Sequence, residues 1–189
     1  MPLHSFYKHI EHFQKLAPES ISALTAISKS VSIKKNADLQ SIGHTCKTIY
    51  FIKKGVARIY YFKDDIDITE SFSFENNIVV RFESLFTGRP SKKGIQMLED
   101  SEVVAINATE LFKLYDNHHD IERLFRKIFE AALVDQVNRI ESLQFHAAEE
   151  RYNSLIKESP DVLKRVPLKF IASYLGITPV SLSRIRGQK

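Results

Sequence analysis

Side chains suited to contacting nucleic acid gather in one short segment near the C-terminus of this 189-residue chain. Arg184 carries a guanidinium, which can bond the O6 and N7 atoms of guanine as a pair. Thr178 and Ser181 carry hydroxyls that can reach bases or phosphates, and Lys169 and Arg186 add positive charge suited to phosphates. The candidate contact residues are Lys169, Thr178, Pro179, Val180, Ser181, Arg184 and Arg186.

Two amphipathic helices joined by a glycine are predicted to position these side chains. The apolar face of the first helix has i, i+3, i+4, i+7 spacing, and Gly176 can adopt the left-handed conformation that ends such a helix. Thr178 is a good N-cap for the second helix, and Pro179 suits its first position because its N–H would have no partner there. The pattern is typical of a helix-turn-helix, whose second helix enters the DNA major groove. The first face consists of Leu168, Ile171, Ala172 and Leu175.

Charge favours a polyanion partner for this end of the chain. Six bases and no acid follow Asp161, whereas the rest of the chain has 21 bases and 23 acids. An ordinary helical hairpin that closes a small bundle, or a helix-turn-helix that binds a protein, would have the same spacing, but neither explains the charge asymmetry as well. The six bases are Lys164, Arg165, Lys169, Arg184, Arg186 and Lys189.

Residues 166–186, VPLKFIASYLGITPVSLSRIR, resemble the helix-turn-helix of bacterial regulators in the cyclic-AMP receptor protein/Fnr family, most closely its short branch. The resemblance implies an N-terminal β-roll of the cyclic-nucleotide-binding type, a long dimerisation helix and a C-terminal DNA-binding domain. Members of that branch usually carry an acidic residue where this chain has Val180. Because valine cannot accept a hydrogen bond from a cytosine amino group, base preference does not transfer from those relatives.

Residues 31–106 show the period-two alternation of β-strands, after two short helices expected within residues 5–30. β-Branched and aromatic side chains recur along these runs, and turn signals stand at 53–55 (Lys-Lys-Gly) and 63–65 (Lys-Asp-Asp). Many short strands at a spacing of roughly 8 to 12 residues predict an antiparallel barrel or sandwich. The order of strands and glycines also resembles the β-roll of the same family.

The ligand site that the resemblance implies is degenerate in this chain. Members that bind cyclic AMP present a carboxylate from a short helix and hold the cyclic phosphate with an arginine followed by a small residue. Here no glycine precedes Glu83, and Pro90 follows Arg89. We therefore expect no cyclic AMP and no cofactor; the alternative is a switch that binds a cyclic nucleotide or another small acidic or apolar effector in the roll. The candidate ligand residues are Glu83, Arg89, Ser91 and Lys92.

Residues 119–146 contain no glycine or proline and carry an apolar stripe at three- and four-residue steps. A helix of this length spans roughly 40 Å, more than a small barrel covers. Self-pairing as a two-helix coiled coil would bury the stripe, whereas packing only on its own domain is the alternative. The expected dimer interface is Ile121, Leu124, Phe125, Ile128, Ala132, Val137 and Ile140.

The expected architecture is therefore α+β in three parts. Residues 1–116 form an antiparallel, cyclic-nucleotide-binding-like β-roll with flanking helices, 117–147 a dimerisation helix, and 148–189 the helix-turn-helix domain. Double-stranded DNA and a second copy of the chain are the predicted partners, and RNA polymerase is a candidate partner for which no motif is present. These features predict a DNA-binding transcriptional regulator that acts as a homodimer.

Composition and the residue pattern argue against other classes. No apolar run approaches the roughly 20 residues of a membrane helix. The single Cys46 can form no internal disulfide and cannot alone hold a metal or an iron–sulfur cluster, which fits the cytoplasm. The sequence has no Ser/His/Asp or Cys/His constellation, no phosphate-binding glycine loop and no metal-ligand spacing, so we predict neither an enzyme nor a metal site.

Overall fold

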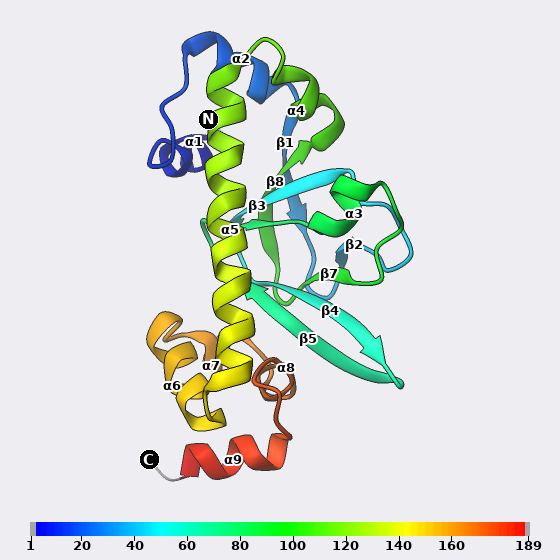
Figure 1. The fold of residues 1–189 in the computed structure, drawn as a ribbon, viewed down its shortest axis with the longest axis vertical. Coiled ribbons are helices and arrows are strands. Elements are labelled where there is room, and N and C mark those ends of the chain that lie inside the picture. Colours follow the sequence, from blue (N-terminus) through cyan, green and yellow to red (C-terminus); the bar gives the residue numbers. More distant parts are fainter. Residues whose placement is uncertain (1–2, 188–189) are drawn as a thin grey trace.

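The computed structural model describes residues 3–187 (Figure 1). Lys189 and the outer ends of the predicted domains 1–116 and 148–189 therefore lie outside the described part. An N-terminal roll of two antiparallel sheets is joined to a C-terminal group of helices by one long helix. The strands are β1 (Ser28–Ile33), β2 (Asp38–Gln40), β3 (Thr48–Lys54), β4 (Ala57–Lys63), β5 (Ile66–Ser73), β6 (Ile78–Val79), β7 (Gly94–Met97) and β8 (Ser101–Asn107). The helices are α1 (His4–Ile10), α2 (Pro18–Ala26), α3 (Phe82–Thr87), α4 (Ala108–Leu114), α5 (His119–Phe145), α6 (Ala148–Glu158), α7 (Val162–Arg165), α8 (Leu168–Tyr174) and α9 (Pro179–Gly187).

The two sheets have the strand orders β1-β8-β3-β6 and β2-β7-β4-β5, and every pair is antiparallel. Alternation along β3 explains how the first sheet is buried on both faces. Ile49 and Phe51 pack with the helices outside the roll, whereas Ile52 packs between the sheets. The antiparallel roll expected from the period-two pattern is confirmed.

The β4–β5 hairpin turns where the sequence predicted it. Asp64 and Asp65 have φ angles of 51° and 61°, the conformation of a two-residue turn that matches the twist of the strands. The turn at Gly55 requires glycine on steric grounds. Its φ is 119°, and a Cβ atom there would lie 2.0 Å from Ser101 Oγ, so only glycine fits.

Helices α1, α2 and α4 pack with the first part of α5 on the outer face of the first sheet (Figure 1). Phe6 and Phe125 are fully buried in this cluster. Asp120 fixes the beginning of α5, because its carboxylate accepts hydrogen bonds from Ser20 Oγ at 2.7 Å and from the Ala17 N–H at 2.8 Å. The first half of the long helix therefore belongs to the roll.

The C-terminal helices form a further cluster that includes two residues of the roll, Val56 and Leu98. The roll and the C-terminal helices therefore share apolar contacts at their junction. The single turn of α7 has no counterpart among the predicted helices, because four residues are too short for a helical period to show. No helix within residues 3–187 is both long enough and apolar enough to span a bilayer.

Candidate nucleic-acid interface and roll cavity

Helix α8 ends at Gly176 as the sequence predicted. Gly176 has a φ of 67°, a conformation that is strained for other residues. The Ile177 N–H reaches back to the Ala172 carbonyl at 3.0 Å, which satisfies an acceptor at the end of the helix. Ile171, Ala172 and Leu175 are fully buried, so α8 is held by its apolar face. Leu168, the fourth residue expected on that face, is 39% exposed.

Thr178 caps α9, as expected from its position before Pro179. Its Oγ1 accepts a hydrogen bond from the Ser181 N–H at 3.1 Å, and its carbonyl accepts one from the Leu182 N–H at 3.0 Å. The hydroxyls of Thr178 and Ser181 lie 3.0 Å apart and bond each other. Both hydroxyls thus stand at the first turn of α9, where a recognition helix approaches base edges.

The outer face of α9 is open and basic. Leu182 is buried beneath it, whereas Val180 is 63% exposed and Arg184 and Arg186 are exposed. Within residues 3–187, neither arginine forms an ion pair, so both are available to a polyanion. Lys169 on α8 is also exposed, and its Nζ lies 4.8 Å from the centroid of the Phe170 ring.

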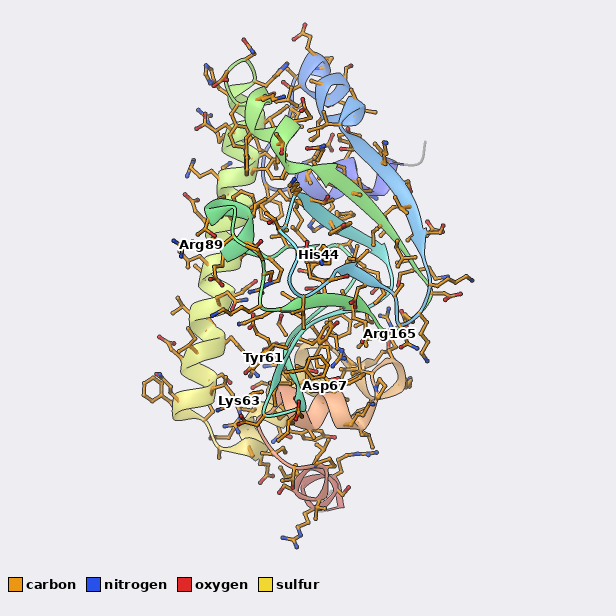
Figure 2. All side chains as sticks on the ribbon, turned by 90° about the vertical axis from the view of Figure 1, so that its right-hand side faces the viewer. His44, Tyr61, Lys63, Asp67, Arg89 and Arg165 are labelled. Atoms are coloured by element: carbon orange, nitrogen blue, oxygen red, sulfur yellow. The ribbon has the colours of Figure 1, made fainter. Side chains whose placement is uncertain are left out.

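The β4–β5 hairpin holds α8 from the roll side (Figure 2). The Thr69 N–H donates to Ser173 Oγ at 2.8 Å. The Arg58 guanidinium lies 3.7 Å from the centroid of the Phe170 ring and donates two hydrogen bonds, of 2.6 and 2.8 Å, to the Asp67 carboxylate. A paired and stacked arginine of this kind gives a defined geometry, so α8 has a fixed position on the roll.

Two further arginines hold the C-terminal end of α8. Arg139 of α5 lies 3.8 Å from the Tyr174 ring centroid and donates to the Tyr174 carbonyl. Arg151 of α6 donates to the Leu175 carbonyl through Nε at 3.1 Å and Nη2 at 2.8 Å. Positive charge is favourable here because the last carbonyls of a helix lack intrahelical partners.

Arg165 of α7 forms a further polar contact between the helices and the roll. It donates two hydrogen bonds, of 2.9 and 2.6 Å, to Glu75 and also pairs with Glu99. The pKa of Glu75 is lowered from 4.5 to about 2, chiefly because the Arg165 guanidinium donates hydrogen bonds to its carboxylate. Glu75 also accepts from the Gly55 N–H at 2.7 Å, which links the contact to the turn before β4.

Helix α5 does not present its whole apolar stripe to solvent. Ile121, Leu124 and Phe125 are fully buried and Ile128 is 8% exposed, all within the cluster formed with α1, α2 and α4. This corrects the expected dimer interface, because these four side chains are already covered by their own protomer. Ala132 is half-buried. The exposed large apolar residues of α5 are Leu133 (65%), Val134 (57%), Val137 (45%), Ile140 (53%), Leu143 (45%) and Phe145 (74%).

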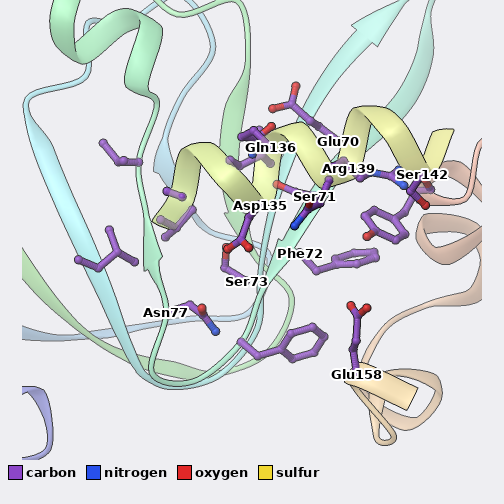
Figure 3. A pocket seen from close by; sticks show the side chains of 18 of the residues that line it. Glu70, Ser71, Phe72, Ser73, Asn77, Asp135, Gln136, Arg139, Ser142 and Glu158 are labelled. Atoms are coloured by element: carbon purple, nitrogen blue, oxygen red, sulfur yellow. Dashed lines mark hydrogen bonds between the residues drawn. The ribbon is translucent and has the colours of Figure 1, made fainter. Parts of the chain in front are cut away.

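A cavity of about 670 Å³ lies between β5, β6, α5 and α6 (Figure 3). Glu70 of β5 lines it and pairs with two cations that also line it, Arg81 and Lys93. Phe72 and Asn77 from the roll and Asp135 from α5 are also part of the lining. The cavity thus combines charged, polar and aromatic side chains from the roll and the long helix.

Comparison with known proteins identifies the N-terminal part of the chain. Residues 30–118 match the family described as the cyclic nucleotide-binding domain. This segment is therefore similar to that domain. No protein with a curated description matches the sequence.

Solved structures share the fold over most of the chain. FixK2 from Bradyrhizobium japonicum has a TM-score of 0.74 at 17% identity and covers 86% of this chain and 84% of its own. A putative Crp/Fnr-family transcriptional regulator from Eubacterium rectale has 0.72 at 15%, covering 90% and 82%. The c-di-GMP-responsive regulator CLP from Xanthomonas campestris has 0.68 at 17%, covering 91% of both. The chain therefore has the fold of Crp/Fnr regulators, as the resemblance implied.

The four predicted ligand residues do not line the roll cavity together. Glu83 is exposed and lines the cavity, but Arg89, Ser91 and Lys92 are not part of its lining. Arg89 lies on the α3 side of the domain, away from the C-terminal helices (Figure 2). The buried Ser91 hydroxyl is engaged locally, since it donates to the Lys93 carbonyl at 2.7 Å and accepts from the Lys93 N–H at 3.1 Å.

Sequence reasoning missed the charged cluster of the roll, which consists of Glu70, Arg81 and Lys93. One signal was present, because Arg81 is a single base within an apolar run, 78–82 (Ile-Val-Val-Arg-Phe). A base in such a run is buried and needs a partner. Nothing in the sequence indicates that Glu70 and Lys93 meet there, since they lie 11 and 12 positions away on other elements.

Proposed function

We propose that this chain is a DNA-binding transcriptional regulator that acts as a homodimer through its C-terminal helix-turn-helix. The observation that carries the proposal is the open face of α9, where Arg184 and Arg186 are exposed beside the capped first turn. Arg184 reads a guanine, while Lys169 and Arg186 neutralise phosphates. Thr178 and Ser181 contact bases or phosphates at the beginning of the helix.

Homodimerisation is supported by the exposed second half of α5. Leu133, Val137 and Ile140 follow the four- and three-residue steps of a coiled-coil seam and are about half exposed or more. Pairing two copies about a two-fold axis would cover the seam and present two copies of α9. Such a dimer reads two half-sites about 34 Å apart, one turn of DNA.

The salt dependence of DNA binding tests the phosphate contacts. Binding to a pool of random duplexes is measured over a range of salt concentrations for the wild type and for Arg186→Ala. Loss of one phosphate contact lowers the slope of log affinity against log salt by about one. Lys29→Ala is the matched control, since Lys29 is an exposed base on β1, a strand of the roll that lies away from α9 (Figure 1). An equal change in both variants would contradict the assignment.

A ligand-responsive switch is the second candidate, and its specific support is the cavity that the roll and α5 line together. A ligand there would contact both the roll and the helix that carries the proposed dimer seam, so it could bias one arrangement over another. Of the residues predicted to hold cyclic AMP, only Glu83 lines this cavity, which argues against cyclic AMP as its ligand. A thermal-shift screen of cyclic nucleotides and small acids tests this candidate, and stabilisation by none of them counts against it.

A further inference from the structure

Two cations from different elements meet at one wall of the cavity. Arg81 directly precedes α3, and Lys93 directly precedes β7. Their side chains are 10% and 33% exposed. Burial lowers the pKa of both groups, because surroundings of low polarity disfavour the charged forms. Cations held in this way require an anion close by.

Glu70 supplies that anion from within the chain. Its Oε1 accepts from Arg81 Nη1 at 3.2 Å, and its Oε2 accepts from Lys93 Nζ. Both carboxylate oxygens are therefore used, one for each cation. The Lys93 ammonium also lies 5.3 Å from the centroid of the Tyr61 ring, which fixes its place. Figure 3 shows Glu70 at the cavity wall together with Gln136 and Arg139 of α5.

The cluster retains further capacity for an anion. The two cations share one ion-paired carboxylate, and Glu83 acts on Arg81 through its charge without forming an ion pair within the described residues. Arg81 Nε is buried and has no hydrogen-bond partner within residues 3–187. A buried donor without an acceptor is costly, so its presence beside the cavity indicates that this wall suits an oxyanion.

We propose that Arg81 and Lys93 form an anion-binding site in the roll and that Glu70 is its intramolecular occupant, filling the place of the acidic group of a small oxyanion. The ligand class is a compact oxyanion, either a short carboxylate or phosphate. In the wild type this anion site is thereby occupied by the chain's own carboxylate. One consequence rests on the proposed function: the regulator binds DNA without any acidic effector.

Chemical rescue tests the occupant directly. Glu70→Ala removes the carboxylate and leaves space for an added one. The melting temperature of the variant is measured with acetate or inorganic phosphate up to about 100 mM and compared with that in chloride at equal ionic strength. We expect acetate or phosphate to raise the Tm of the variant by about 3 °C or more relative to chloride, and to leave the wild type unchanged. Glu83→Ala is the control for loss of negative charge alone, because Glu83 lines the same cavity and acts on Arg81 through its charge but forms no ion pair within the described residues.

Each result decides the proposal. The proposal is overturned if acetate and phosphate do not raise the Tm of Glu70→Ala relative to chloride. It is also overturned if they raise the Tm of Glu83→Ala or of the wild type by the same amount. If Glu70→Ala does not fold in chloride, acetate is included during refolding, and recovery of the folded protein supports the proposal while failure of acetate and phosphate alike contradicts it. None of these readouts involves DNA, so their failure would leave the proposed DNA binding standing.

Discussion

Dimerisation through the second half of α5 can be tested at one side chain, Ile140. It is 53% exposed in the protomer and lies on the seam with Leu133 and Val137. Full burial of an isoleucine contributes about 1.5–3 kcal/mol, so covering the exposed half contributes about 1 kcal/mol per copy. Two copies contribute about 2 kcal/mol, which corresponds to roughly 30-fold in the dissociation constant of the dimer.

We therefore expect Ile140→Lys to weaken the dimer by at least about 30-fold, because the change removes apolar contacts and brings two lysines together at a two-fold seam. Sedimentation equilibrium over a range of protein concentrations measures the effect. Ile66→Lys is the matched control, since Ile66 is 62% exposed but lies at the end of the β4–β5 hairpin. An unchanged dissociation constant in Ile140→Lys, or equal weakening by Ile66→Lys, would refute the reasoning.

Three other substitutions probe the C-terminal helices. Arg184→Ala should relax base specificity at one operator position by about 1–3 kcal/mol, and equal weakening on every sequence in a competition assay would contradict base reading. Thr178→Ala should lower the free energy of unfolding by about 0.5–2 kcal/mol through loss of the α9 cap, measured by urea denaturation; no loss would mean that the cap does not stabilise α9. Because the pKa of Glu75 is lowered from 4.5 to about 2, its contribution to stability is complete above pH 4.5 and is lost as the pH falls towards 2. The Tm difference between the wild type and Arg165→Gln should therefore narrow with acidification, and a difference independent of pH would argue against the ion pair.

Periodicity predicted which residues share a face, but it could not say what covers that face. The apolar stripe of α5 was expected to be one dimer surface, yet its first half packs with Phe6 and Leu111. Those partners come from α1 and α4, and their contact with α5 depends on how the helices fold over the first sheet. The helix-turn-helix was predictable because its determinants are local: Gly176 and Thr178 act on backbone groups a few residues away.

The polar contacts between the roll and the C-terminal helices had no signal in the sequence. Arg165 and Glu75 are 90 positions apart, and each resembles an ordinary surface charge when it is considered alone. Ser173 likewise gives no sign in the sequence that it accepts a hydrogen bond from Thr69, which lies 104 positions away. Such pairs are determined by tertiary geometry and not by spacing. Arg81 differs because its apolar neighbours already indicate burial, although they do not identify Glu70 as its partner.

The central claim is that α9 reads a DNA sequence as one half of a symmetric dimer. The most direct test is selection of the purified protein on a pool of random duplexes at two salt concentrations, followed by sequencing of the retained fraction. We predict enrichment of an inverted repeat with half-sites about one helical turn apart. Retention that falls with salt and enriches no sequence would contradict the claim, because it would leave only non-specific contact between basic side chains and phosphates.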